Sequence, residues 1–413
     1  MEVAIVGGSI AGCAAAVELI HGGHRVTVFE RSTGTLEGRG AGIGTPTGTL
    51  QQLVDRDLVD SDMPRFVVSA HALGGRTTAE ERLGHTALTL PLDMALCNWG
   101  DLCRQLRRRV PEEAYRPGCT VTDVLPGGAS RPVLQLDNGK EHPADLVLFA
   151  DGYRSLGRRL LFPDSTLAYR GYVLWRGVLE ERSLPDSGPL ETALYRLHYK
   201  GLPGNAVFYF VPGRGGSIQP GSRRVNWACY VPVPQGDLPA FLIDREGRGR
   251  ETSIPPGLMR PDEERRLKAL MATHLPPYFA DIVSGSRNTF VQPIYTVVVP
   301  GYAKGRCALI GDAGSVAPPF TGSGVFKATR NAIDLVEALA ASQDTDEALG
   351  AWSAAQTETG KRLAALGEQM EEAFVWAAPD LSAMGEATAR AWWQDAVTFP
   401  ADFSYLRDAE PPD

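Results

Sequence analysis

The chain lacks the long apolar runs and the cysteine pairs that mark several classes of protein. No stretch reaches the roughly 18 consecutive apolar residues that a membrane-spanning helix needs, so we expect no membrane partner. The cysteines show neither a CxxC pair nor a Cys/His metal spacing, and we therefore expect no metal site and a reduced, cytoplasmic protein with free thiols. They are Cys13, Cys97, Cys103, Cys119, Cys229 and Cys307.

The chain also has fewer basic than acidic residues. The formal net charge is -8 at pH 7, which argues against a nucleic acid or an acidic membrane as a partner. A strand-like run begins almost at the first residue, so we expect no signal peptide ahead of the fold. With 413 residues, of which 43% are hydrophobic, the chain can bury more than one core, and we expect two closely joined domains.

What the sequence does contain begins with an apolar run, a glycine-rich turn and a helical pattern. Val3–Val6 is typical of a buried parallel strand, Ile10–Ile20 has the composition and spacing of a helix, and Arg25–Glu30 has the pattern of the next strand. This order predicts a dinucleotide-binding unit, in which the turn and the helix N-terminus meet a pyrophosphate. Glu30 then lies where an acidic residue accepts hydrogen bonds from ribose hydroxyls.

The glycine-rich turn itself, GGSIAG at residues 7–12, follows the GxGxxG pattern incompletely. Gly7 and Gly12 match, whereas Ser9 occupies the position of the middle glycine. The Ser9 hydroxyl could donate to a phosphate oxygen, although its side chain narrows the approach to the backbone. The alternative for the whole unit is an ordinary βαβ crossover without a ligand.

Two further strand-like runs end in short polar motifs. Asp145–Ala150 leads into the Asp-Gly pair 151–152, at a strand end where open α/β sheets bind ligands; the alternative is a plain turn before a basic helix. Arg306–Ile310 leads into GDAGSVAPPFTGSG at residues 311–324. Asp312, at the carboxyl end of that strand, can accept hydrogen bonds from ribityl hydroxyls.

The loop after Asp312 suits a docked ring. Pro318–Pro319 stiffens it, and Gly322 and Gly324 keep side chains away from whatever binds there. Val325–Leu339 predicts a helix whose N-terminus points at this loop, where it would stabilise negative charge on a bound ring.

Together, the three motifs resemble those of the FAD-dependent aromatic hydroxylases with the p-hydroxybenzoate hydroxylase fold, and the resemblance extends over essentially the whole chain. That family has a GxGxxG turn, a DG motif and a GD motif ending in PPxxGxG; here they are GGSIAG, ADGYRSLGR and GDAGSVAPPFTGSG. Three other segments look most like the 2,6-dihydroxypyridine 3-hydroxylase branch: GYVLWRGVL at 171–179, RRVNWACYVPV at 223–233 and DREGRGRETSIPPGLMRP at 244–261.

The resemblance implies an α/β fold, with a Rossmann-like FAD-binding domain, an inserted antiparallel β-sheet substrate domain and a C-terminal helical segment. FAD would be bound non-covalently, and NADPH or NADH would bind transiently as electron donor, since only one dinucleotide-binding unit is visible. RGAGIGT at 39–45 is similar to the family loop beside the isoalloxazine. The FAD-binding residues implied are Gly7, Ser9, Ile10, Ala11, Gly12, Glu30, Arg31, Arg39, Ala41, Gly42, Asp151, Asp312, Pro319, Gly322, Gly324 and Val325.

The predicted domains are discontinuous in sequence. The FAD-binding domain takes residues 1–66, 94–166 and 292–345; the substrate domain takes 67–93 and 167–291; the C-terminal helical segment takes 346–413. Alternating patterns such as Ala206–Val211 predict an antiparallel sheet that covers the flavin. Residues 244–265, dense in charge, Gly and Pro, predict a long surface loop.

The resemblance also implies a reaction, namely hydroxylation of a small aromatic or N-heteroaromatic substrate by O2 through a flavin C4a-hydroperoxide, in a protein that is a monomer or homodimer. The substrate would react best as a phenolate, so a proton acceptor near its ring would help. Candidates are His198, Tyr195 and Tyr209 on the predicted sheet, although ordinary sheet packing would also explain each. Arg176 could pair with a substrate anion or stabilise the sheet.

Some residues depart from the family pattern. Phe326 and Asn331 stand where most members have Asn and then Asp, Ser315 stands where His is frequent, and Trp99 stands where many members have Arg. Two alternatives therefore stay open: a flavin-dependent halogenase or ring reductase, and a flavin-binding protein that has lost catalysis. The WxWxIP string usual in halogenases is absent, which disfavours a halogenase.

Overall fold

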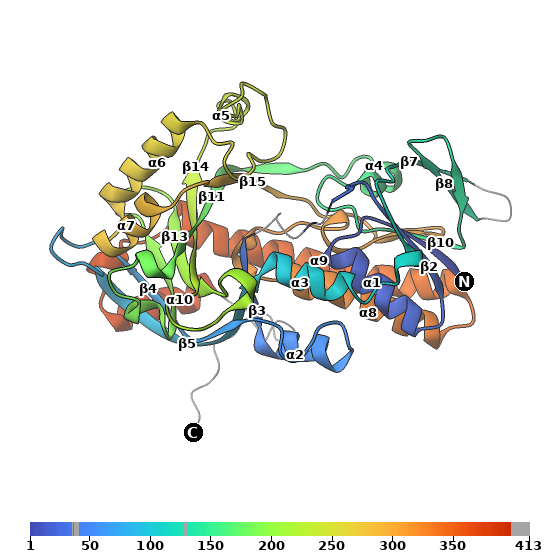
Figure 1. Ribbon diagram of the computed structural model, residues 1–413, viewed down its shortest axis with the longest axis horizontal. Helices are drawn as coiled ribbons and strands as arrows, with labels where there is room; N and C mark the ends of the chain where they lie inside the picture. The colour runs from blue at the N-terminus through green and yellow to red at the C-terminus, as the bar shows by residue number, and fades with distance from the viewer. Residues whose placement is uncertain (35, 37–40, 127–130, 398–413) are drawn as a thin grey trace.

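The computed structural model describes residues 1–34, 36, 41–126 and 131–397, and within these residues the strands form three sheets (Figure 1). The first sheet has six strands, parallel except for the antiparallel edge pair β16–β17. Their order is β16 (Ala303–Lys304), β17 (Cys307–Leu309), β10 (Leu146–Phe149), β1 (Glu2–Val6), β2 (Arg25–Glu30) and β6 (Tyr115–Pro117).

The register of this sheet brings the three sequence motifs to one edge. Val6 pairs with Phe149, and Phe149 pairs with Leu309, so three parallel strands end at the same level. Backbone hydrogen bonds continue just beyond the last pairs, from Ala150 N to Val6 O (2.8 Å) and from Ile310 N to Phe149 O (2.9 Å). The glycine-rich turn, the Asp-Gly pair and the Gly-Asp loop therefore meet at the carboxyl ends of the strands, where α/β sheets bind ligands.

The second sheet is larger and mostly antiparallel, with eight strands in the described chain. Their order is β15 (Phe290–Thr296), β11 (Ala168–Glu180), β14 (Arg224–Pro232), β13 (Asn205–Val211), β12 (Ala193–His198), β4 (Phe66–Gly75), β5 (His85–Asn98) and β3 (Gly42–Pro46). The predicted α/β fold with an inserted antiparallel sheet is confirmed. The domain boundaries stay a prediction, and β3 joins this second sheet although it lies within 1–66.

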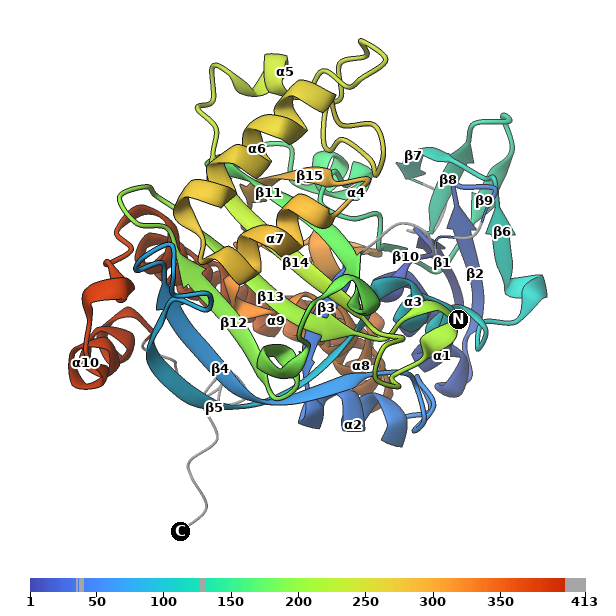
Figure 2. The ribbon, with the colours of Figure 1, turned by 60° about the vertical axis from the view of Figure 1, so that its left-hand side comes forward.

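The two faces of the second sheet bury different partners, because side chains alternate along each strand. One face carries Trp175, Leu197 and Phe208 and packs under α6 (Pro261–His274) and α7 (Pro277–Gly285), which Figure 2 shows lying across the sheet. The other face is covered by the C-terminal helices α9 (Thr345–Glu371) and α10 (Glu386–Ala396). The face a residue occupies therefore decides whether it can reach the interior beside α9.

Helices also join the two halves of the molecule. In the nucleotide-binding half, α1 (Ile10–His21) packs against α8 (Gly324–Ala341) and α3 (Trp99–Arg107). The long helix α9 reaches both halves: its first turns contribute Leu349 and Trp352 to the core of the first sheet, and its last turns contribute Leu363 and Met370 to the core of the second. The shorter helices are α2 (Thr47–Asp55), α4 (Leu156–Leu161) and α5 (Leu238–Phe241).

The predicted surface loop over 244–265 is wrong at both ends. Asp244 is buried, where its carboxylate pairs with Arg250 and accepts hydrogen bonds from the backbone N–H groups of Glu246 and Arg248. At the other end, α6 begins at Pro261. Proline is favourable at the first helical position and acidic residues are favourable in the first turn, and both signals are present in PDEE.

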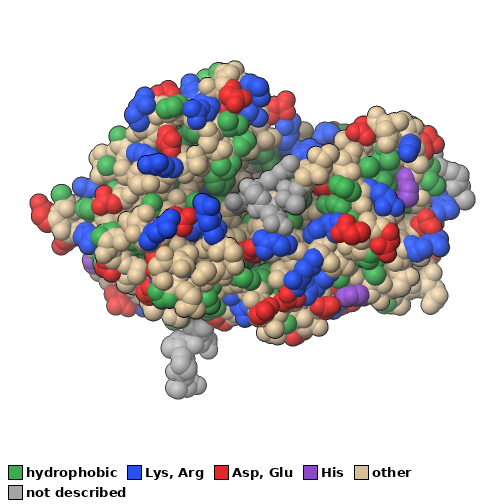
Figure 3. Space-filling model, in the orientation of Figure 1, with side chains coloured by type: hydrophobic (Ala, Val, Ile, Leu, Met, Phe, Trp, Pro, Cys, Tyr) green, Lys and Arg blue, Asp and Glu red, His purple; other side chains and the backbone are tan. Residues whose placement is uncertain are grey.

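A small three-stranded sheet completes the nucleotide-binding half, formed by β7 (Val121–Pro126), β8 (Pro132–Leu136) and β9 (Glu141–Pro143). Charged side chains of both signs are interspersed over the face of the molecule in Figure 3. Across the part of the chain that the structure describes, no helix has the length and apolar character needed to cross a membrane.

Candidate functional site

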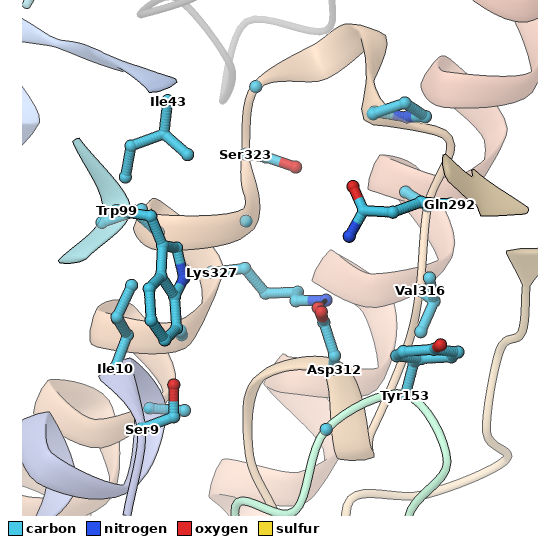
Figure 4. A pocket seen from close by; sticks show the side chains of 18 of the residues that line it. Ser9, Ile10, Ile43, Trp99, Tyr153, Gln292, Asp312, Val316, Ser323 and Lys327 are labelled. Atoms are coloured by element: carbon cyan, nitrogen blue, oxygen red, sulfur yellow. Dashed lines mark hydrogen bonds and ion pairs between the residues drawn. The ribbon is translucent and has the colours of Figure 1, made fainter. Parts of the chain in front are cut away.

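One cavity of about 1420 Å³ extends from the strand ends of the first sheet to the inner face of the second sheet. Figure 4 shows Ser9, Ile10, Ile43 and Trp99 on one side of it and Tyr153, Val316 and Gln292 on the other, with Lys327 and Asp312 between them. All three sequence motifs thus line a single space, which also reaches the predicted substrate sheet.

The glycine-rich turn is fixed by close backbone packing. Gly7 has a φ of +104°, and a Cβ there would lie 2.4 Å from the carbonyl oxygen of Ala150. A Cβ on Gly12 would lie 1.8 Å from the carbonyl oxygen of Gly7, so helix α1 sits directly against the turn. Ser9 precedes α1 without forming a side-chain cap, which leaves its hydroxyl available at a helix N-terminus that favours anions.

The end of β2 presents the predicted acidic residue. Glu30 is only 7% exposed, and its two carboxylate oxygens accept hydrogen bonds from the backbone N–H groups of Gly8 (2.9 Å) and Ser32 (2.8 Å). These bonds hold the carboxylate beside the glycine-rich turn, where it lines the cavity together with Arg31.

The Asp-Gly motif, which follows β10, is linked by hydrogen bonds to the Gly-Asp loop, which follows β17. One oxygen of Asp151 accepts a hydrogen bond from the backbone N–H of Leu156 (2.6 Å), while the other is buried without a partner in the described structure, and burial raises the pKa of this carboxyl. Arg158 donates to the backbone oxygens of Asp312 (3.3 Å) and Ala313 (3.1 Å). An arginine of the second motif therefore positions the loop of the third.

The Gly-Asp loop combines an ion pair with an open glycine surface. Lys327 is almost fully buried, and its Nζ lies 2.9 Å from Oδ1 of the half-exposed Asp312. Gly322 has a φ of +62°, and neither Gly322 nor Gly324 has a described atom within 4 Å of the position a Cβ would take. Helix α8 begins at this point, so its N-terminus and a side-chain-free surface face the cavity together.

Three side chains of the second sheet form hydrogen bonds with the backbone of Gly42. The N–H of Gly42 donates to Oδ1 of Asn226 (2.8 Å), and its carbonyl oxygen accepts hydrogen bonds from Tyr209 (2.9 Å) and Arg176. A Cβ on Gly42 would lie 2.7 Å from Val211, so only glycine fits. Burial raises the pKa of Tyr209 to about 12, so its hydroxyl stays protonated at neutral pH and acts as a donor to Gly42.

Beyond Gly42 the cavity has mainly apolar walls. They come from the inner face of the second sheet, the loop before α8 and the C-terminal helices: Leu92, Met94, Leu96, Leu174, Leu194, Val207, Ala228, Phe320, Met370, Phe374 and Trp393. Polar side chains at this end are His71, Arg176, Arg196, Tyr209, Tyr230 and Gln292. An apolar chamber with a few convergent polar groups suits a small aromatic ligand.

The structure brings most of the predicted FAD-binding residues together around the cavity. Those that line it are Gly7, Ser9, Ile10, Ala11, Glu30, Arg31, Ala41, Gly42, Asp151, Asp312, Pro319, Gly322, Gly324 and Val325. Gly12 lies beneath the turn, where it allows the close packing of α1. Arg39 lies outside the described residues.

The three candidates for a proton acceptor lie in different surroundings. Tyr209 lines the cavity, but its hydroxyl donates to Gly42. Tyr195 lies on the opposite face of the sheet, with its ring centroid 5.1 Å from that of Phe279. His198 lies on the inner face but does not line the cavity, because the rings of Phe374 and Trp392 (6.0 and 5.5 Å) enclose it.

Several lining residues were not predicted, among them His71, Lys327 and Tyr153. For Arg196 the sequence did hold a signal, since a charged residue interrupts the apolar positions of the strand ALYRLH. For His71 the only guide is register: it pairs with Leu194 across β4 and β12, and pairing cannot be deduced from one strand alone.

The departures from the family pattern have structural partners here. Asn331 accepts a hydrogen bond from the backbone N–H of Gly311 (2.8 Å), and the hydroxyl of Ser315 lies 2.6 Å from that of Tyr302. Both side chains therefore support the Gly-Asp loop. Trp99 lines the cavity on the same side as Ile10 and Ile43, as Figure 4 shows.

Residues 169–296, which span β11 to β15, match the family model described as FAD binding domain-like. The chain is 29% identical over 364 residues to 2,6-dihydroxypyridine 3-monooxygenase of Paenarthrobacter nicotinovorans, covering 87% of this chain and 88% of that protein. It is 25% identical over 350 residues to 3-amino-4-hydroxybenzoate 2-monooxygenase PtnB3 of Streptomyces platensis, covering 82% and 80%.

The same relationship holds in three dimensions. The solved structure of 2,6-dihydroxypyridine-3-hydroxylase from Arthrobacter nicotinovorans superposes with a TM-score of 0.82 at 25% identity, over 92% of this chain and 93% of that one. The chain is thus similar in sequence and fold to FAD-dependent aromatic hydroxylases, which confirms the resemblance predicted from the motifs. Within that class, the predicted similarity to the 2,6-dihydroxypyridine 3-hydroxylase branch is confirmed as well.

Proposed function

We propose that the protein is an FAD-dependent monooxygenase that uses NADPH or NADH and O2 to hydroxylate a small aromatic or N-heteroaromatic compound. The observation that carries this proposal is the single cavity, in which a dinucleotide-type site at the strand ends opens directly into an apolar chamber beneath the second sheet. A cofactor ring and a small substrate would therefore share one space.

The side chains and backbone at the strand ends fit FAD. Two helix N-termini, at Ser9 and Gly324, face the cavity, and the buried Glu30 lies at the end of β2. The space above Gly322 and Gly324 could admit a planar ring, and the free oxygen of Asp151 lacks a partner. When bound, FAD would accept a hydride from the nicotinamide nucleotide and activate O2 for transfer of one oxygen atom to an electron-rich ring.

The chain's own residues orient and shield the reactants. Gly42, anchored by Asn226, Tyr209 and Arg176, gives the cavity a fixed wall of backbone. The apolar walls contributed by Phe320 and Phe374 would disfavour water around a bound ring, where electrostatic interactions are stronger than in bulk solvent.

The function is tested by following NADH and NADPH oxidation together with oxygen uptake and peroxide release across a panel of aromatic and N-heteroaromatic compounds. We expect slow oxidation without substrate, strong acceleration with the true substrate and mostly peroxide with poor mimics, because access of substrate commonly gates such sites. A flavin-free protein that gains no FAD from excess cofactor, or a lack of oxygen-dependent turnover with every compound, would contradict the proposal.

A substitution at the adenosine end tests the placement of FAD. Glu30→Gln removes the charge but keeps the shape of the side chain, and we expect it to weaken FAD roughly tenfold, because hydrogen bonds to a charged group contribute about 1.5–3 kcal/mol. Glu2→Gln, at the amino end of β1 and away from the cavity, is the matched control and should leave the affinity unchanged. Fluorescence titration with FAD measures both; equal affinities would argue against this placement.

We also propose that the protein is cytoplasmic and a monomer or a homodimer. All six cysteines lie in the described residues and none forms a disulfide, which supports a reducing compartment. Light scattering after size-exclusion chromatography would distinguish a monomer from a dimer by mass.

A further inference from the structure

At the substrate end, the cavity is bounded by aromatic rings that touch one another in a row. The ring centroids of Tyr230 and Phe320 lie 4.7 Å apart, and those of Phe320 and Phe374 lie 5.6 Å apart. The row continues from Phe374 to Trp393 (5.8 Å) and from Trp393 to His71 (5.6 Å). All five residues line the cavity, and separations of about 4.5–7 Å are those of rings in contact. This row, the aromatic wall, leaves no gap between neighbours that would admit another ring.

Phe374 is the middle ring of the aromatic wall and is fully buried. Besides its two neighbours in the row, it contacts the rings of His198 and Trp392, with centroid separations of 6.0 Å in both cases. Neither His198 nor Trp392 lines the cavity. Phe374 therefore separates the cavity from the packed region that holds these two residues.

The backbone that carries Phe374 is fixed to the second sheet. Helix α9 is followed by a π-helical turn, Glu372–Trp376, and such turns are rare and frequently occur at functional sites. The carbonyl oxygen of Phe374 accepts a hydrogen bond from Nδ2 of the buried Asn205 (3.0 Å), at the start of β13. The carbonyl oxygen of Val375 accepts one from the backbone N–H of Gly204 (2.9 Å). The turn therefore cannot move away from the cavity without breaking these hydrogen bonds.

We propose that Phe374 is a specificity-determining residue that limits the substrate to a single aromatic ring. A second ring fused to the substrate on the side that faces the aromatic wall would overlap Phe374, whereas a single ring leaves it in place. Because packed interiors do not accept added atoms without strain, the limit is steric. This inference rests on the proposed function, because it names the size class of the substrate for the same cavity.

The test compares single rings with their benzo-fused counterparts by calorimetric titration of the FAD-loaded enzyme. Phenol is paired with 2-naphthol, and 2-hydroxypyridine with 2-hydroxyquinoline and 1-hydroxyisoquinoline, which carry the fused ring on different edges. A fused ligand has more apolar surface to bury, so an unrestricted site would bind it more tightly than the single ring. For the parent enzyme we expect the opposite, with each single ring bound roughly tenfold more tightly than its fused partners, as the strain of overpacking predicts.

Variants then assign the size limit to Phe374. Phe374→Ala removes the ring and should tighten the binding of the fused ligands by roughly tenfold, while the affinity for single rings changes less. Phe374→Leu fills more of the space and should shift the ratio in the same direction by a smaller factor; it replaces the alanine variant if that protein does not fold. Trp376→Leu is the matched control, because Trp376 belongs to the same turn, is 39% exposed and does not line the cavity, and it should leave the ratio unchanged.

The outcomes separate this inference from the proposed function. A fused ligand that binds the parent as tightly as its single-ring partner would overturn the size limit, as would an unchanged ratio in both Phe374 variants or a lack of binding by every ligand to parent and variants alike. Hydroxylation of fused compounds by the parent would also overturn it, while the proposed function would stand. A ratio that shifts as expected, in an enzyme that oxidises no nicotinamide nucleotide with any compound, would support the size limit and count against the proposed function.

Discussion

Gly12→Ala is expected to prevent the protein from retaining FAD and to destabilise it by more than about 3 kcal/mol. The new Cβ would lie 1.8 Å from the carbonyl oxygen of Gly7 and 3.3 Å from Cβ of Ala150. The first of these atoms is backbone, held by strand β1, and cannot move aside without displacing the turn. The distortion would therefore disrupt the packing of α1 against the strand ends, where the cofactor site lies.

The matched control for this variant is Gly48→Ala. Gly48 is also a helical glycine, but it is exposed in α2 and no atom lies within 4 Å of the position of its added Cβ. Alanine should be neutral there or should stabilise the helix by up to about 1 kcal/mol. Thermal unfolding and the ratio of flavin to protein absorbance measure both variants. If the Gly12→Ala protein retains flavin and unfolds at the same temperature as Gly48→Ala, the turn tolerates the added side chain.

The second large effect is a loss of stability in acid that depends on His198. The pKa of His198 is about 3 in the folded protein because of burial, against 6.5 for an ordinary histidine. Between these values the unfolded chain binds more protons than the folded one, so this contribution is complete above pH 6.5 and is lost as the pH falls. At about 1.4 kcal/mol per pH unit, we expect a loss of roughly 2–3 kcal/mol between pH 7 and pH 4.5.

Urea unfolding of the parent and of His198→Leu at these two pH values measures this contribution. The variant removes the titrating group, so its free energy of unfolding should fall less with acid by roughly the same 2–3 kcal/mol, whatever the carboxylates of the protein contribute to both. His21→Gln, at an exposed position in α1, should behave as the parent. Identical pH dependence in parent and His198→Leu would mean that the imidazole gains a proton without unfolding the chain.

The nucleotide-binding half could be predicted closely because its signals are local. The predicted strand Arg25–Glu30 is the observed β2, and the helix predicted from Val325 to Leu339 is α8 with a few residues added. Each motif directly follows its strand, so a parallel register was enough to bring Gly7, Asp151 and Asp312 to one edge.

The substrate end was harder to predict, because its residues meet only through the register of non-neighbouring strands. Tyr195 and Arg196 are adjacent in sequence, yet one packs under α7 and the other faces the cavity, since successive side chains of a strand point to opposite faces. Whether the odd-numbered or the even-numbered side chains of β12 face the cavity depends on where α9 and α10 pack. These helices come more than 140 residues later in the sequence. His71 reaches the same wall from a strand that precedes β12 by more than 100 residues.

Helix α9 has a consequence for how the molecule can move. Its 27 residues form a rod of about 40 Å, with Trp352 seated in one core and Met370 in the other. A hinge between the halves would have to bend this rod or pull one of its ends out of a packed interior. We therefore expect the halves to stay coupled during turnover, so that reactants exchange through rearrangement of the loops around the cavity mouth. For the same reason, protease cleavage between the halves should not release either one as an independently stable fragment.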